Sequence, residues 1–216
     1  MPTETYAEKR EFWAALARDL KYVTPRGSAS WCSRRIPGWA TLAYHFSTVS
    51  AIRRTARIAA AGGMGPMEFA ECCQNIMRGA ERAGGVFAIE GIEHVARSAP
   101  AVFVSNHMGS LETLVLGCLT VPFCDTTFVL KESLMRYPVF GHIIRGLDPI
   151  TVGRVSPRDD LHGVMTGGAA RLGAGRSVIV FPQATRSPVF DEDMFNSLGA
   201  KLAAKAGVPL VPVAVK

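Results

Sequence analysis

The sequence lacks an apolar run long enough to cross a membrane. A transmembrane helix needs about 20 consecutive apolar residues. Even the most apolar stretch, residues 111–130, is interrupted by Glu112, Pro122 and Asp125. The first residues are acidic and polar, so the basic segment followed by an apolar segment that marks a secretory signal is also missing. The sequence therefore predicts no membrane span and, by default, a cytoplasmic protein.

Cysteine is scarce and irregularly spaced. The five cysteines are Cys32, Cys72, Cys73, Cys118 and Cys124. They form no C-x-x-C pair of the kind that binds zinc, and they are too few for a disulfide scaffold. We expect a reducing compartment and no metal site.

Charged residues are also few, at 19% of the chain against 48% hydrophobic residues. Such a composition excludes the disordered, collagen-like and coiled-coil classes. A length of 216 residues is enough for one domain with a real hydrophobic core.

The net charge of +6 is concentrated in the first part of the chain. Residues 1–60 contain ten Lys and Arg against four Asp and Glu, whereas residues 61–216 contain fourteen of each. This asymmetry indicates either an anionic partner, nucleic acid or a lipid surface, or merely solvated helix charges. Nucleic acid is the weakest alternative, because no recognition motif is present and the rest of the chain is neutral.

Three helices are predicted before residue 85. Residues 5–20 have Phe12, Trp13 and Leu16 at helical spacing, and residues 39–61 have a second stripe that includes Leu42 and Phe46. A third helix is predicted over residues 66–82, with proline at its start and glycines after its end. Charge and apolar stripes together predict a basic, membrane-facing helical subdomain over residues 1–85, docked on anionic lipid. The alternative is that these stripes cover the rest of the fold.

From residue 86 on, short β-rich runs alternate with helical patterns. Strands are predicted at residues 86–90, 101–105, 127–131, 149–152, 177–181 and 209–215. The helical patterns between them cover about residues 107–118, 138–145, 157–172 and 192–206. This alternation is typical of an α/β fold with a mostly parallel sheet flanked by helices, which we expect over residues 86–216.

The strongest candidate for chemistry is His107, which follows the predicted strand at residues 101–105. Reactive groups in open α/β sheets lie at the carboxyl ends of strands. We expect Glu112, five residues later, to reach back to the imidazole. A carboxylate that binds one ring nitrogen leaves the other free to accept a proton, so the pair could act as a general base and its orienting group.

Cationic side chains follow three other predicted strands. Lys131, Arg154 and Arg186 each come at or just after a strand end, and Thr185 and Ser187 flank the last of them. Guanidinium and hydroxyl groups are suited to binding phosphate. If these strands are parallel neighbours, their cations converge at one edge of the sheet.

Several sequence blocks resemble the 1-acylglycerol-3-phosphate acyltransferases and related lysophospholipid acyltransferases. Residues 106–112 (NHMGSLE) resemble the family block N-H-x-x-x-x-D, and residues 181–187 (FPQATRS) resemble F-P-E-G-T-R-S. Residues 131–141, 146–154 and 208–213 are similar to three further blocks, the last of them V-P-x-x-P-V. Blocks in the same order and spacing are far more specific than one motif.

The resemblance implies transfer of a fatty acyl group from an acyl thioester to the free hydroxyl of a lysophospholipid. The donor would be acyl-CoA or acyl-ACP, so acyl carrier protein is an implied partner, and neither a metal nor another cofactor is needed. His107 would be the base and Glu112 its orienting group. The implied substrate-binding residues are Asn106, Lys131, Arg154, Phe181, Pro182, Gln183, Thr185 and Arg186. The enzyme would lie peripherally on the cytoplasmic face of the membrane.

Three residues depart from the family blocks: Glu112 replaces aspartate, Gln183 replaces glutamate and Ala184 replaces glycine. The chain also stops at Lys216, directly after the last block, so an α/β domain truncated at its C-terminal end is expected. These departures leave two alternatives open. One is an acyltransferase for a phosphate-free lysolipid, such as an amino-acid-containing lipid. The other is a catalytically impaired lipid-binding protein.

Overall fold

The computed structural model describes residues 6–98, 100–183 and 185–216, so the substitution at Ala184 lies outside the described residues. Its centre is a five-stranded sheet in the order β5-β4-β6-β3-β7. The strands are β3 (Val102–Ser105), β4 (Thr126–Lys131), β5 (Ile150–Val152), β6 (Ser177–Val180) and β7 (Leu210–Val213). Each neighbouring pair is parallel. The predicted α/β class with a mostly parallel sheet is therefore confirmed.

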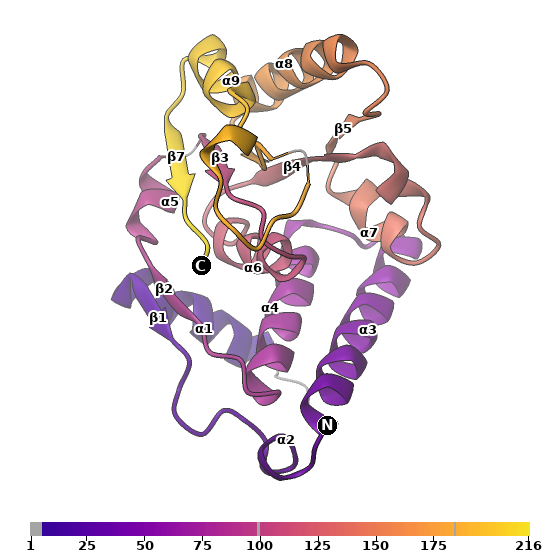
Figure 1. The fold of residues 1–216 in the computed structure, drawn as a ribbon, viewed down its shortest axis with the longest axis vertical. Helices are drawn as coiled ribbons and strands as arrows, with labels where there is room; N and C mark the ends of the chain where they lie inside the picture. The colour runs from indigo at the N-terminus through magenta and orange to yellow at the C-terminus, as the bar shows by residue number, and fades with distance from the viewer. Residues whose placement is uncertain (1–5, 99, 184) are drawn as a thin grey trace.

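Helices cover both faces of this sheet (Figure 1). On one face lie α8 (Pro157–Gly173) and α9 (Leu198–Ala206), which pack against each other and on the strands. The other helices are α1 (Tyr6–Asp19), α2 (Trp31–Arg35), α3 (Trp39–Ala60), α4 (Pro66–Arg82), α5 (Glu93–Arg97), α6 (Leu111–Thr120) and α7 (Phe140–Gly146). Two short 3-10 helices cover Glu132–Arg136 and Glu192–Met194.

Alternate residues of each strand belong to two different hydrophobic cores. Phe103 and Ile179 join the core formed with α1, α4 and α6, whereas Val102 and Val178 join the core formed with α8 and α9. Successive side chains of a strand point to opposite faces of the sheet, and helices cover both faces here. This is why the strands read as continuous apolar runs.

The first predicted strand of the α/β region is in a different sheet. Residues 86–90 contain β2 (Ala88–Glu90), which pairs antiparallel with β1 (Lys21–Val23) in a separate two-stranded sheet. Every residue of β6 is buried, whereas β2 is exposed at alternate positions. The expectation that residues 86–90 belong to the main sheet was wrong. One face of β2 is exposed to solvent, whereas helices bury both faces of the main sheet.

The helices before residue 85 share the core of the sheet. Phe12, Trp13 and Leu16 of α1 are 7%, 6% and 2% exposed and pack in the same cluster as Phe103 and Phe128. The stripe on α1 is therefore a core stripe, and its expected contact with lipid was wrong. The boundary placed at residues 85 and 86 marks no break in packing.

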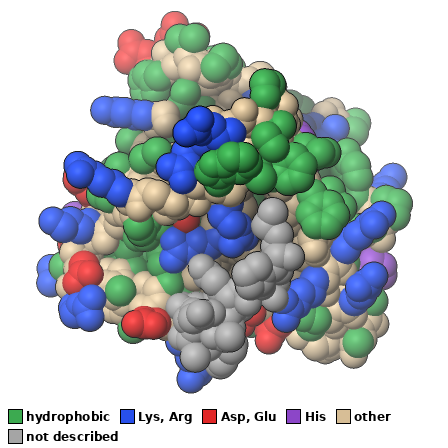
Figure 2. Space-filling view, turned by 90° about the horizontal axis from the view of Figure 1, so that it is seen from below, with side chains coloured by type: hydrophobic (Ala, Val, Ile, Leu, Met, Phe, Trp, Pro, Cys, Tyr) green, Lys and Arg blue, Asp and Glu red, His purple; other side chains and the backbone are tan. Residues whose placement is uncertain are grey.

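The stripe on α3 has the opposite environment. Leu42, Phe46 and Val49 are 63%, 70% and 49% exposed, while Ala51 and Thr55 on the opposite side of the helix are buried in the protein. Figure 2, viewed from the end where α2 lies, shows hydrophobic side chains gathered beside Lys and Arg. Among the described residues, no helix combines the length and the hydropathy needed to cross a bilayer.

Candidate active site

His107 lies in a loop between β3 and α6. The helix predicted from about residue 107 begins instead at Leu111, so the expectation that His107 opens this helix was wrong. The loop is folded back by Glu112, whose Oε1 accepts the backbone N–H of Gly109 at 2.8 Å. This contact draws the loop over the first turn of α6 and brings the imidazole to the carboxylate.

The side chains of His107 and Glu112 form a hydrogen-bonded pair. His107 Nδ1 lies 2.7 Å from Glu112 Oε1, and the two side chains are 15% and 8% exposed. Burial acts to raise the pKa of Glu112, but the hydrogen bonds from His107 and Gly109 outweigh it, and the net pKa is below its usual value. An ionised carboxylate only accepts hydrogen bonds, so Nδ1 is the donor, and in the neutral imidazole the lone pair is then on Nε2.

The backbone of His107 is held by the loop that follows β6. Gln183 Oε1 accepts the N–H of His107 at 2.5 Å, and the N–H of Ser187 donates to the carbonyl of His107 at 2.9 Å. Gln183 is only 3% exposed. The block at residues 181–187 therefore fixes both polar backbone groups of the candidate base.

Asn106 is held on the other side, by the segment after β7. Its Nδ2 donates to the carbonyl of Val215 at 2.8 Å, and its Oδ1 accepts the N–H of Val215 at 2.7 Å. Asn106 is 6% exposed. Both ends of its amide are engaged by backbone, so a direct substrate contact, as expected from the sequence, is not what this arrangement favours.

The three cations follow neighbouring strands. Lys131 ends β4, Arg154 follows β5 and Arg186 follows β6, and these strands are adjacent in the order β5-β4-β6. All three side chains are exposed. The premise that these strands are parallel neighbours is thus confirmed, and the three cations follow the same edge of the sheet as His107.

The loop that contains Arg154 has an unusual backbone. Arg154 has φ of 59°, in the left-handed region that residues other than glycine rarely adopt. The carboxylate of Asp160 in α8 accepts the N–H groups of Gly153 and Arg154, both at 2.8 Å. Asp160 therefore holds a strained turn at the site edge, where strain is often maintained by function.

The remaining predicted residues of the block at 181–187 have different surroundings. The Phe181 ring packs on the imidazole of His107, with centroids 4.6 Å apart. The carbonyl of Pro182 accepts the backbone N–H of Asn196 at 3.2 Å, while Thr185 is exposed to solvent. Phe181 thus fixes the imidazole plane, and Thr185 is available to a ligand.

Four contributors to the site were missed by reasoning from the sequence: the backbone N–H groups of Gly109 and Ser187, the carboxylate of Asp160, and the backbone of Val215. Backbone groups leave no side-chain signal. Asp160 had one, because it lies in the first turn of a predicted helix beside the block that ends at Arg154.

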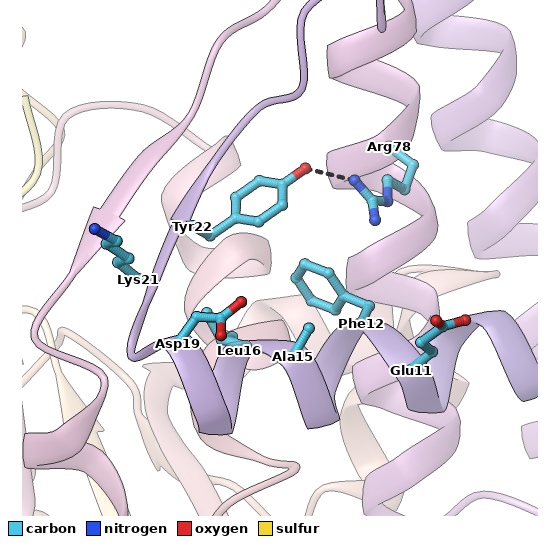
Figure 3. A pocket seen from close by; sticks show the side chains of 8 residues that line it. All are labelled: Glu11, Phe12, Ala15, Leu16, Asp19, Lys21, Tyr22 and Arg78. Carbon is cyan, nitrogen blue, oxygen red and sulfur yellow. Dashed lines mark hydrogen bonds between the residues drawn. The ribbon is translucent and has the colours of Figure 1, made fainter.

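A cavity of about 360 Å³ lies elsewhere, between α1, β1 and α4 (Figure 3). Tyr22 donates to Glu81 at 2.5 Å, and Arg78 contacts both Tyr22 and Glu81. None of the residues that line this cavity belongs to a loop at the carboxyl edge of the main sheet. Tyr22 and Arg78, bonded to each other and to Glu81, hold β1 onto α4.

Comparisons with known proteins bear directly on this geometry. A family model described as Acyltransferase matches residues 86–216, more than half of the chain. The chain belongs to this acyltransferase family. The matched range contains His107, Glu112 and the three cations, so the family match and the carboxyl edge of the sheet coincide.

This chain resembles several curated proteins over part of their length. It is 33% identical over 132 residues to the 1-acyl-sn-glycerol-3-phosphate acyltransferase of Pseudomonas aeruginosa, covering 61% of this chain and 50% of that protein. It is 31% identical over 121 residues to the lyso-ornithine lipid O-acyltransferase of Rhizobium meliloti, covering 55% of this chain and 39% of that protein. The chain thus spans half or less of the length of these relatives.

A solved structure supports the fold. The crystal structure of the 1-acyl-sn-glycerophosphate (LPA) acyltransferase PlsC from Thermotoga maritima matches with a TM-score of 0.60 and 21% identity. The match covers 82% of this chain and 73% of that one, so it extends into the helices before residue 86.

Proposed function

We propose that this acyltransferase moves a fatty acyl group from an acyl thioester, acyl-CoA or acyl-ACP, to the hydroxyl of a lysophospholipid, most favourably 1-acylglycerol-3-phosphate. The observation that supports this best is the pair of His107 and Glu112, with a free Nε2 at the carboxyl edge of the sheet. The acyltransferase family match and the similarity to the Pseudomonas aeruginosa enzyme support the same reaction class.

The reaction needs one general base and no covalent enzyme intermediate. His107 Nε2 takes the hydroxyl proton while the acceptor oxygen attacks the thioester carbonyl carbon. The tetrahedral intermediate then expels the thiolate as the carbon–sulfur bond breaks, and the imidazolium returns the proton to sulfur. Glu112, ionised throughout, stabilises the imidazolium that forms between these steps.

The three exposed cations indicate where the phosphate of the acceptor binds. Arg154 and Arg186 follow strands on the side of β3 where β6, β4 and β5 lie, with Lys131 between them in strand order. A guanidinium binds a phosphate with two parallel hydrogen bonds, which holds the acceptor in one orientation. We therefore place the acceptor phosphate over the ends of β5, β4 and β6 and its hydroxyl toward His107.

A second candidate is acyl transfer to a phosphate-free, amino-acid-containing lysolipid. Gln183 supports it, because an amide, which both donates and accepts hydrogen bonds, stands where the family block has glutamate. The similarity to the lyso-ornithine lipid O-acyltransferase supports it as well. The reaction at His107 would be the same in both cases.

A lipid substrate calls for contact with a membrane surface, and we place this contact on α2 and α3. Trp31 and Phe46 are 65% and 70% exposed. The neighbouring exposed basic residues are Arg34, Arg35, Arg53, Arg54 and Arg57. Exposed aromatic and aliphatic side chains beside arginines are suited to the headgroup region of an anionic bilayer. The enzyme would then act as a peripheral protein on the cytoplasmic face.

The experiment that tests this function measures transfer from labelled acyl-CoA and acyl-ACP to a panel of lysolipids. Lysophosphatidic acid is expected to be the best acceptor. In parallel, His107→Ala is expected to lose activity by about a hundredfold to ten-thousandfold, the usual contribution of a general base. Circular dichroism of the variant should match that of the wild type, because His107 lies in a loop and not in the core.

Three outcomes would contradict the proposal. Preference for a lyso-ornithine acceptor would favour the second candidate. Lipid binding without transfer to any acceptor would indicate an impaired lipid-binding protein. Full activity of a folded His107→Ala protein would remove the proposed base.

A further inference from the structure

β3, the strand that leads to His107, has a neighbouring strand on each side. The segment that follows each of these neighbours contacts the residues after β3. β3 lies between β6 and β7. The loop after β6 binds the backbone of His107, and the segment after β7 binds the side chain of Asn106. The two residues that follow β3 are thus held from both sides.

The contact between Asn106 and Val215 imitates one more step of a β-ladder. β7 pairs with β3 up to Ser105 and Val213, and both strands end there. Two residues later, the backbone N–H and C=O of Val215 exchange two hydrogen bonds with the Asn106 amide, at 2.7 and 2.8 Å. A primary amide has the donor and the acceptor of a peptide group, which Asp and Leu, of similar size, do not combine.

We propose that Asn106 is a positioning residue, which fixes the catalytic loop by binding the backbone of Val215, and that residues 214–216 therefore belong to the working site. This inference rests on the proposed function of His107. Because Asn106 is 6% exposed, loss of Val215 would leave a buried amide without partners, and the loop would rearrange to solvate it. His107 is the next residue, so the rearrangement would move the base.

The effect is expected on the chemical step and not on substrate binding. Each polar atom of the Asn106 amide already has a backbone partner, and the residue is only 6% exposed, so no substrate contact is expected. A displacement of about 1 Å at a reacting group lowers the rate by about a hundredfold. Asn106→Ala should therefore lower kcat by about tenfold to a hundredfold, with the KM of both substrates changed by less than about threefold.

Two variants of Val215 distinguish the contribution of its backbone from that of its side chain. Val215→Pro removes the N–H that Asn106 Oδ1 accepts, so it should reproduce most of the kcat loss of Asn106→Ala. Val215→Ala keeps both backbone groups, so its kcat should lie well above that of Val215→Pro. In the double variant Asn106→Ala with Val215→Pro, the two losses should not add, because both changes remove the same contact.

A second readout does not depend on activity. Hydrogen exchange at the Val215 amide is expected to be slow in the wild type and fast in Asn106→Ala, because the side-chain acceptor protects it. If the wild type transfers no acyl group while this protection is present, the proposed function fails and the contact stands. Asn106→Asp keeps an acceptor but loses the Nδ2 donor, so its kcat should lie between those of the wild type and Asn106→Ala. It replaces Asn106→Ala in the test if that variant does not fold.

Two results would overturn the proposal. A rise in acceptor KM in Asn106→Ala, with Val215→Pro unaffected, would show that Asn106 binds substrate. Unchanged kcat in both folded variants, or an unprotected Val215 amide in the wild type, would show that the contact does not position the base.

Discussion

One oxygen of Glu112 binds two groups of the loop between β3 and α6: Nδ1 of His107 at 2.7 Å and the N–H of Gly109 at 2.8 Å. The carboxylate therefore orients the imidazole and also folds the loop that positions it. The family block that residues 106–112 resemble has an aspartate at this place, one methylene shorter. The longer side chain reaches His107 from the first turn of α6 without the histidine being part of the helix.

Removal of the charge on Glu112 should affect the rate more than the fold. Glu112→Gln keeps an oxygen that accepts from Gly109, so the loop should persist. The neutral amide no longer stabilises the imidazolium, and kcat should fall by about a hundredfold to ten-thousandfold. Steady-state kinetics with thermal unfolding as the control checks this. A folded variant with wild-type kcat would contradict the role of Glu112.

The same contacts predict how stability depends on pH. The pKa of Glu112 is lowered in the folded protein, so its ionised form stabilises the fold above the unfolded-state pKa of about 4.3. That contribution should be lost as the pH falls through the lowered folded-state pKa. The difference in Tm between wild type and Glu112→Gln should therefore shrink as the pH falls below about pH 4. A difference that grows on acidification below about pH 4 would contradict the direction of the pKa shift.

Arg154 and Arg186 should affect the acceptor more than the donor. Each Arg→Ala change removes a hydrogen bond to a charged group, which contributes about 1.5–3 kcal/mol. We expect kcat/KM for lysophosphatidic acid to fall by about tenfold to a hundredfold, while the KM of the acyl donor changes little. Arg136→Ala is the control, because Arg136 is exposed and its guanidinium is bonded to Glu132. Equal losses for donor and acceptor would indicate a structural role for the two arginines.

Membrane binding should depend on α3 and on lipid charge. Replacing Leu42 and Phe46 by Ser removes exposed apolar area, and replacing Arg53, Arg54 and Arg57 by Gln removes three charges worth about 1 kcal/mol each near an anionic surface. Flotation with anionic vesicles should show weaker binding for both sets, by about a hundredfold for the arginine set. Val86→Ser is the control, since Val86 is 76% exposed outside α3. Equal binding to neutral and anionic vesicles would contradict the electrostatic part.

The parallel sheet was predictable because its strands are buried on both faces and read as apolar runs between helical patterns. The burial of helices was not predictable from the same kind of signal. The stripe with Phe12 and the stripe with Phe46 have similar spacing, yet Phe12 is 7% exposed and Phe46 70%. An apolar stripe shows which residues share a helix face. Whether that face is buried depends on tertiary contacts with residues far away in the sequence.

The site shows the same division. His107 and Glu112 are five residues apart and were predictable from local geometry. The partner of Asn106 is 109 residues away and uses only backbone atoms, for which no sequence pattern exists. Gln183 was expected to bind substrate from its place in a family block, but its contact with the backbone of His107 depends on β6 lying next to β3.

Gln183 contacts the backbone of His107, and we also expect it to influence the choice of acceptor. Its Oε1 accepts the N–H of His107, and either Gln or Glu offers such an oxygen. Gln183→Leu has none, so it should lower kcat for all acceptors alike, by about threefold to tenfold for one neutral hydrogen bond.

Gln183→Glu keeps that oxygen and changes the charge, so it should leave the positioning intact and alter the choice of acceptor. In the wild type, the neutral amide both donates and accepts hydrogen bonds, and we expect a weak preference for lysophosphatidic acid over a phosphate-free lysolipid. With the glutamate of related enzymes restored, the ratio of the two kcat/KM values should rise by about threefold to tenfold, the size of one polar contact. The measurement compares both acceptors in wild type, Gln183→Glu and Gln183→Leu. If the ratio is the same in all three proteins, Gln183 has no part in selectivity and acts through His107 alone.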